Sequence, residues 1–115
     1  MDWTVYLDET SGELATLRRE IPETAAAFSA LAKSATLPGV LDTRTKELIA
    51  LGIGIAVRCE ACIGFHVRAA ARAGARREEI TETIAMGVYM GGGPSLMYGA
   101  KTLAAWDSLT DQARP

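Results

Sequence analysis

The segment from Leu48 to Val57 constrains the fold more than any other part of the chain. Nearly all of it is apolar, with Gly52 and Gly54 set between large side chains. Its β-branched residues are compatible with a buried strand. However, the segment continues a polar stretch that follows Asp42, a residue type favoured at helix N-caps. A helix that is apolar on all sides belongs at the centre of a fold. We therefore predict a central helix whose glycines allow neighbouring helices to approach closely.

Segments of helical pattern occupy the first third of the chain as well. Thr10 and Glu13 have the spacing of a capping box, which predicts the entrance of a first helix there. Pro22 ends that helix and suits the first turn of a second one, expected over residues 22–34. Phe28 and Leu31 are expected to mark the buried side of this second helix.

Glycine-containing breaks divide the remainder of the chain. A helix is expected from Cys59 to Ala73, with Gly74 in the position after its C-cap. The run Gly91–Pro94 separates two further helices. Alanine is abundant and aromatic residues make up only 6% of the chain, which also favours helix. We predict an all-α fold of five to six helices in one domain, 1–115, with a loose tail at 111–115.

Both cysteines and the only histidine lie within one short stretch, as Cys59, Cys62 and His66. At about 100° per residue, the two thiols and the imidazole share one face of the predicted helix. Cys62 and His66 are four residues apart, close enough to interact across one turn. Helix N-termini and nearby imidazoles favour the thiolate, the nucleophilic form of cysteine. A second cysteine nearby can resolve a sulfenic acid. The pattern predicts a thiol–disulfide active site.

Glu47 is the candidate third member of this site. It lies near the start of the apolar helix, an unusual position for a carboxylate without a partner. A carboxylate held against His66 would orient the ring and raise its basicity. Whether Glu47 reaches His66 depends on the turn between the two helices. The simpler alternative is a first-turn carboxylate stabilised by the helix dipole.

Charge and hydropathy exclude several classes of protein. The net charge of −2 gives no general attraction to nucleic acid or anionic lipid. The longest apolar stretch, Ile49–Val57, is too short to span a bilayer, and the N-terminus lacks the basic region of a secretory signal. We therefore expect a cytoplasmic protein that needs no cofactor. In that compartment a cysteine pair is more often catalytic or metal-binding than structural.

Metal binding is the main alternative to redox chemistry. Cys59, Cys62, His66 and Glu47 could together form a four-ligand zinc site. Structural zinc sites usually draw their ligands from two separated pairs, and a second Cys/His pair is absent from the sequence. Redox use is therefore preferred. A thiol–disulfide oxidoreductase or redox sensor, and a non-redox isomerase or decarboxylase using only His66 and Glu47, are further alternatives.

Beyond these local patterns, the chain resembles the alkylhydroperoxidase D-like (AhpD-like) branch of the carboxymuconolactone decarboxylase family. The resemblance runs over residues 38–106 and is carried by the segments Leu41–Ala50, Cys59–His66, Ala73–Ala75 with Glu78–Ile80, and Gly91–Pro94. It implies an all-helical fold that assembles as a homotrimer or homohexamer. It also implies peroxidase or disulfide-reductase activity.

The resemblance also implies a role for each site residue. Cys62 would attack a hydroperoxide, Cys59 would resolve the product, and His66 with Glu47 would relay protons. An external dithiol, such as a lipoyl-bearing or thioredoxin-like protein, would restore the thiols. Members with the best-defined peroxidase activity carry a histidine where this chain has Ala61, so the relay here has one titratable group fewer. The decarboxylase branch generally lacks the CxxC, which disfavours lactone decarboxylation.

Overall fold

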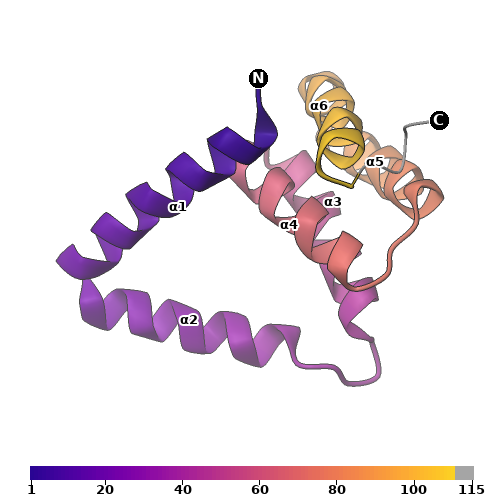
Figure 1. The fold of residues 1–115 in the computed structure, drawn as a ribbon. Coiled ribbons are helices and arrows are strands. Elements are labelled where there is room, and N and C mark those ends of the chain that lie inside the picture. Colours follow the sequence, from indigo (N-terminus) through magenta and orange to yellow (C-terminus); the bar gives the residue numbers. More distant parts are fainter. Residues whose placement is uncertain (111–115) are drawn as a thin grey trace.

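The computed structural model describes residues 1–110, which form six α-helices and no strand (Figure 1). The helices are α1 (Trp3–Glu20), α2 (Pro22–Thr36), α3 (Thr43–Ala56), α4 (Glu60–Arg72), α5 (Arg77–Gly91) and α6 (Gly93–Thr110). The predicted all-α class is confirmed. The predicted loose tail lies outside the described residues. Within residues 1–110, every helix is too short or too polar to cross a membrane.

Four helices form the body of the molecule. α3 packs against both α4 and α5, and α6 packs against the same two helices. The core between them is built from Leu51, Ile55, Ile63, Val67, Ala70, Ala75, Ile80, Ala105 and Trp106, joined by Trp3 from α1. The predicted position of α3 at the centre is therefore confirmed.

The prediction that α3 is buried on all sides is wrong for the single chain. Ile49 is 47% exposed and Ile53 is 58% exposed. This side of α3 is therefore only partly covered by the other helices of residues 1–110. Apolar residues surround α3, but the neighbouring helices of residues 1–110 cover only part of this apolar surface.

Glycines set how closely the helices of the body approach α3. A Cβ added at Gly87 of α5 would lie 2.8 Å from Cγ2 of Ile55, so α5 can approach α3 only because this residue has no side chain. A Cβ at Gly54 would lie 3.5 Å from Cβ of Cys62. This is an ordinary van der Waals distance, so close approach of α4 does not require a glycine at position 54, but the contact places α3 directly beside one of the cysteines.

α1 begins earlier than the sequence pattern predicts. The carboxylate of Asp2 accepts a hydrogen bond from the backbone N–H of Val5 at 3.1 Å, and so caps a helix that starts at Trp3. Thr10 lies in the middle of this helix, where its hydroxyl donates to the backbone carbonyl of Tyr6. The predicted helix entrance at Thr10 is therefore wrong, because Asp2 caps the helix eight residues earlier.

The start of α1 is also its anchor to the body. Trp3 and Leu7 are the buried residues of α1. Both side chains lie against Gly64 of α4, where a Cβ would come within 2.7 Å of Leu7 and 3.1 Å of the Trp3 ring. The rest of α1 leads away from the body (Figure 1).

α2 contradicts the predicted burial of its apolar side. No residue of this helix, 22–36, is buried, and Phe28 and Leu31 are 60% and 64% exposed. α2 is joined to α1 at one end (Figure 1). At the other end, Nζ of Lys46 donates to the backbone carbonyls of Ala35 and Leu37. Together α1 and α2 form an arm that projects from the body.

Candidate functional site

A tight turn places Cys59 at the N-terminus of α4. α3 ends at Ala56, and Arg58 then adopts a left-handed conformation with φ of 62°. The backbone N–H of Cys59 donates to the carbonyl of Gly54 at 2.9 Å, which closes the turn. The guanidinium of Arg58 donates to the carbonyl of Gly91 at 3.3 Å, so the strained turn is tied to the end of α5.

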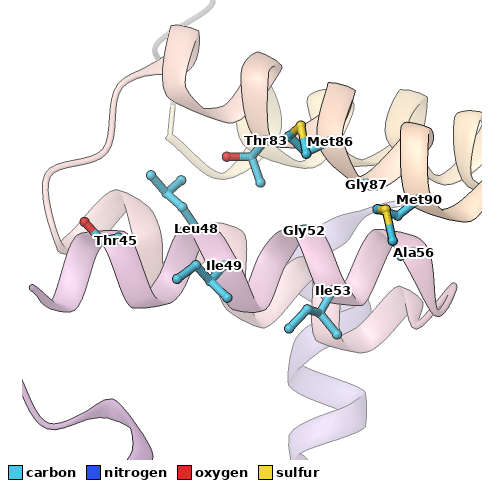
Figure 2. Close-up of a pocket in the computed structure, with 10 residues that line it drawn as sticks. All are labelled: Thr45, Leu48, Ile49, Gly52, Ile53, Ala56, Thr83, Met86, Gly87 and Met90. Carbon is cyan, nitrogen blue, oxygen red and sulfur yellow. The ribbon is translucent and has the colours of Figure 1, made fainter. Parts of the chain in front are cut away.

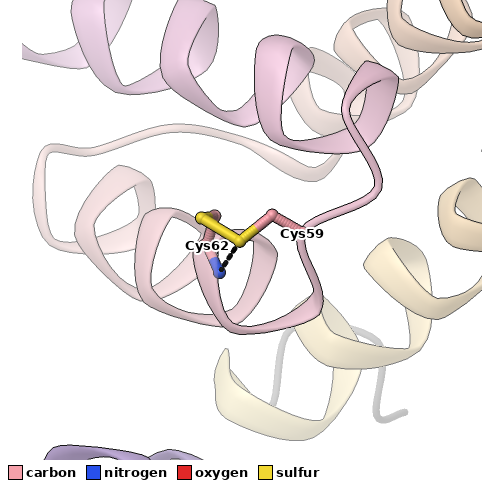
Figure 3. The surroundings of a disulfide bond; sticks show 2 residues. All are labelled: Cys59 and Cys62. Atoms are coloured by element: carbon pink, nitrogen blue, oxygen red, sulfur yellow. Dashed lines mark hydrogen bonds between the residues drawn. A yellow bond between two sulfur atoms is a disulfide. The ribbon is translucent and has the colours of Figure 1, made fainter. Parts of the chain in front are cut away.

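Cys59 is the N-cap residue of α4. Its Sγ accepts a hydrogen bond from the backbone N–H of Cys62 at 3.2 Å. The two sulfur atoms are joined in a disulfide (Figure 3). Both cysteines are partly exposed. The pair therefore combines two features that suit thiol exchange, namely access from solvent and a position at a helix N-terminus.

Glu47 and His66 form a hydrogen-bonded pair between α3 and α4. Oε1 of Glu47 lies 3.1 Å from Nδ1 of His66. Because a carboxylate only accepts, the contact assigns the ring proton to Nδ1 and leaves Nε2 able to accept a proton. The Glu47 side chain is 10% exposed, whereas the His66 side chain is 34% exposed. The carboxylate is thus fixed inside the fold, and the imidazole lies between it and solvent.

The four predicted site residues lie along one seam between two helices. α3 contributes Glu47 and, through Gly54, the surface against which Cys62 packs. α4 contributes His66 and Cys62, one turn apart, and Cys59 caps its start. The structure therefore brings Glu47 to His66. From the sequence alone, this contact depended on the unknown geometry of the turn between the two helices.

The zinc arrangement is not formed. Within residues 1–110, no group of three or more histidine, cysteine, aspartate or glutamate side chains is placed to hold a metal ion. The sulfur atoms of Cys59 and Cys62 are bonded to each other, so neither is a free thiolate ligand. The donor geometry gives the metal alternative no support.

An ion pair beside the disulfide was not foreseen from the sequence. Oε2 of Glu60, the residue after Cys59, lies 3.6 Å from Nζ of Lys101 on α6. It ties the first turn of α4 to α6. Glutamate is common in the first turn of a helix, so the sequence gives no indication that Glu60 pairs with a residue 41 positions later.

An apolar groove lies between α3 and α5, on another side of α3 (Figure 2). Its volume is about 470 Å³, and it is lined by Thr45, Leu48, Ile49, Gly52, Ile53, Ala56, Thr83, Met86, Gly87 and Met90. Gly52 stands five residues after Glu47, which turns it about 140° around the helix. The groove is thus separate from the seam that holds the cysteines.

These features define a class: an all-α protein in which a CxxC pair at a helix N-terminus lies beside a Glu–His pair. Residues 22–105 match the carboxymuconolactone decarboxylase family. A curated relative of uncharacterised function from Cupriavidus necator is 37% identical over 108 residues, which cover 94% of this chain and 96% of the relative. The chain belongs to the carboxymuconolactone decarboxylase family, and its CxxC pair is consistent with the AhpD-like branch.

Solved structures agree with this assignment. A carboxymuconolactone decarboxylase family protein from Legionella pneumophila is 45% identical, with a TM-score of 0.89 over 94% of this chain and 96% of that one. A family member from Thermotoga maritima is 27% identical, with a TM-score of 0.73 over 79% of this chain and 94% of that one. The name of the Thermotoga protein mentions a possible involvement in an antioxidative response.

Proposed function

We propose that this protein is a thiol-dependent peroxidase, an alkylhydroperoxidase-like antioxidant enzyme. Cys59 and Cys62 are its redox pair, and His66 and Glu47 are its proton relay. The observation that carries the proposal is the shared seam: a CxxC disulfide lies one helical turn from an imidazole that a buried carboxylate holds at 3.1 Å. The antioxidative role raised for the Thermotoga relative supports it.

The first step consumes the peroxide. His66 accepts the proton of the Cys62 thiol, and the thiolate attacks the terminal oxygen of the hydroperoxide. An S–O bond forms as the O–O bond breaks. The alkoxide leaves with the proton returned by His66, as an alcohol, and Cys62 becomes a sulfenic acid. Glu47 stabilises the imidazolium that exists between the two proton transfers.

The second step closes the disulfide. The Cys59 sulfur attacks the Cys62 sulfenic acid, the S–S bond forms, and the S–O bond breaks. The oxygen leaves as water with the Cys59 proton. Cys59 is suitably placed for this step, since its Sγ already contacts the first turn of α4 at the Cys62 N–H. The structure holds the pair in the disulfide form that this step produces.

An external dithiol completes the cycle. One of its thiolates attacks the Cys59–Cys62 disulfide to give a mixed disulfide, which its second thiol then resolves. The reductant leaves as a disulfide, and both cysteines return as thiols. A lipoyl-bearing protein or a thioredoxin-like protein has this chemistry. The partial exposure of both cysteines supports access by such a partner.

We also propose that the protein assembles as a homotrimer or homohexamer and acts in the cytoplasm. Large apolar side chains remain exposed on several helices of the single chain, including Phe28, Leu31, Ile53, Met86, Met90 and Met97. Exposed apolar surface of this extent is typical of an interaction site.

A second candidate is a thiol–disulfide oxidoreductase or redox sensor without peroxidase turnover. Ala61 favours it, because the site has no additional titratable group between the cysteines. The two candidates differ in stoichiometry. A peroxidase consumes many equivalents of hydroperoxide per chain when a dithiol is supplied, whereas a sensor consumes one.

Titration of free thiols before and after hydroperoxide tests the proposal. The wild type should lose two thiols per chain. Cys59→Ser should accumulate a sulfenic acid that a dimedone probe traps at Cys62. Full peroxide-dependent thiol consumption in Cys62→Ser would overturn the assignment of Cys62. Consumption of a single equivalent of hydroperoxide by the wild type, with dithiol in excess, would favour the second candidate.

A further inference from the structure

α2 carries an apolar stripe that no other segment of residues 1–110 buries. The stripe consists of Ile21, Ala25, Phe28, Ala32 and Ala35, which fall within about 80° of one another around the helix axis. None of the residues 22–36 is buried. Isolated helices of this length are marginally stable in water, and most helices are stabilised by packing an amphipathic face. The stripe therefore has the character of a surface that packs against a partner.

The groove between α3 and α5 is the complementary surface. Ile49 and Ile53 form its wall on α3, and Met86 and Met90 form its wall on α5 (Figure 2). Gly52 and Gly87 lie where the two helices approach most closely, so the floor lacks large side chains. Methionine side chains are flexible and adapt to the shape of an apolar partner.

The chain holds these two surfaces apart. Lys46 fixes the end of α2 by donating to the carbonyls of Ala35 and Leu37, at distances of 3.0 and 2.6 Å. At its start, α2 follows α1 after the single residue Ile21. Apart from this attachment to α3 at its C-terminal end, α2 lies away from α3 and α5 (Figure 1). Within residues 1–110 the stripe and the walls of the groove are exposed, so both surfaces are available to a second copy.

We propose that α2 of one copy docks its Phe28 stripe into the α3/α5 groove of a second copy. The groove extends from Thr45 to Ala56, about 17 Å at 1.5 Å per residue, and the stripe from Ile21 to Ala35 extends about 21 Å. None of the stripe and groove residues is charged, so docking desolvates no ionic group. This contact rests on the proposed assembly, for which it specifies the surfaces, and it is independent of the thiol chemistry.

The contact joins two different surfaces, the stripe of one chain and the groove of another, and we take it to be head-to-tail rather than reciprocal. Interfaces of this kind close into rings when the rotation between copies allows it. A ring of three chains contains three identical contacts of this type. The same contact would order the α1–α2 arm of every subunit.

Site-specific cross-linking tests the contact in the full-length chain. In a background of Cys59→Ser and Cys62→Ser, one chain carries Phe28→Cys and the other carries Met86→Cys. The two chains are co-expressed, oxidised and separated without reductant. We expect a disulfide-linked dimer that contains one chain of each kind, and at least tenfold less disulfide-linked homodimer from either variant alone.

Leu96→Cys provides the matched control. Leu96 lines a second apolar groove, of about 310 Å³, between α5 and α6, and it is similarly exposed. Preferred cross-linking of Phe28→Cys to Leu96→Cys would overturn the docking surface. Preferred cross-linking of Phe28→Cys to itself would replace the head-to-tail contact with packing of α2 against α2.

Light scattering separates failure of the interface from failure of assembly. We expect the wild type to have a multiple of the 12.2 kDa chain mass at micromolar concentration, and Phe28→Glu to lose that assembly. Val5→Glu, on an exposed position of α1, should keep it. An assembled Phe28→Glu variant would overturn this interface alone. A monomeric wild type would overturn both the interface and the proposed assembly, while leaving the peroxidase proposal to its own test.

Discussion

Glu47 and His66 lie 19 residues apart in the sequence, yet Oε1 of one is 3.1 Å from Nδ1 of the other. The contact exists because α3 and α4 pack antiparallel around the short turn at Arg58, which returns the chain along its own path. Glu47 is buried, and its carboxylate is hydrogen-bonded to the imidazole. The pair is the structural link between the apolar helix and the cysteines.

Glu47→Gln should impair the proton relay without disturbing the fold. The amide keeps the size of the side chain and a hydrogen bond to the ring, but it cannot stabilise an imidazolium. We expect peroxide turnover to fall by about 10²-fold or more, the usual contribution of a positioned acid–base group. The far-UV circular dichroism spectrum should be unchanged. Glu60→Gln removes a carboxylate closer in sequence to the cysteines but paired with Lys101, and should retain most of the activity. Equal losses in both variants would contradict a specific role for Glu47.

Cys59 should act as a helix cap in the reduced protein as well as a redox residue. Its Sγ accepts the N–H of Cys62 at the N-terminus of α4. Serine is a strong N-cap and alanine is a poor one, so Cys59→Ala should unfold with a free energy about 1 kcal/mol lower than Cys59→Ser. Urea denaturation with excess reductant measures the difference. At Cys62, which is not a cap, the serine and alanine variants should differ less. A difference at Cys62 as large as that at Cys59 would contradict the capping role.

Gly64 should control the docking of α1. A Cβ at this position would meet Leu7 and the Trp3 ring, which are the buried residues of α1. Gly64→Ala should therefore destabilise the protein by about 1–3 kcal/mol, the usual cost of overpacking, and increase proteolysis in α1 and α2. Gly12→Ala is the matched control, because nothing lies within 4 Å of a Cβ there. This second variant should be neutral or stabilising, since alanine is the better helix former. Similar destabilisation by Gly64→Ala and Gly12→Ala would contradict the role of Gly64 in the docking of α1.

Local signals in the sequence were sufficient for the helices of the body. Asp42 was expected to cap α3, and its carboxylate accepts from the N–H of Thr45 at 2.8 Å. Hydrogen bonding from the Thr45 side chain, together with this backbone contact, lowers the pKa of Asp42 below its ordinary value. Gly74 was expected just after α4, and it has φ of 90°. Caps and left-handed glycines depend on a few neighbouring residues, so a sequence pattern can predict them.

Features that depend on contacts between distant segments could not be predicted in the same way. Phe28 and Leu31 form an apolar side with helical spacing, but spacing does not reveal which surface covers it. The start of α1 was misplaced because Thr10 and Glu13 imitate a capping box, whereas Asp2 provides the cap and Trp3 provides the anchor. For the site, sequence placed the cysteines and His66 on one face, but only the turn at Arg58 brings Glu47 to them.

Arg77 and Asp107 join α5 to α6, and their contact should make stability depend on pH. Nε and Nη2 of Arg77 donate to the two carboxylate oxygens of Asp107, at 2.9 and 3.0 Å. These hydrogen bonds hold the pKa of Asp107 below its ordinary value of 3.8. A carboxyl whose pKa is lowered by folding stabilises the native state above its unfolded pKa, and this stabilisation is lost as the pH falls through the folded pKa.

Asp107→Asn should therefore lower the free energy of unfolding near neutral pH, and the difference from wild type should shrink below about pH 4. Urea denaturation across this range measures it. Asp8→Asn, on the exposed part of α1, changes the net charge by the same amount and should have little effect at any of these pH values. We expect this result because only the ionised form of Asp107 accepts both hydrogen bonds of Arg77. A difference between wild type and Asp107→Asn that persists unchanged into acid would mean that Asp107 contributes through packing rather than through its charge.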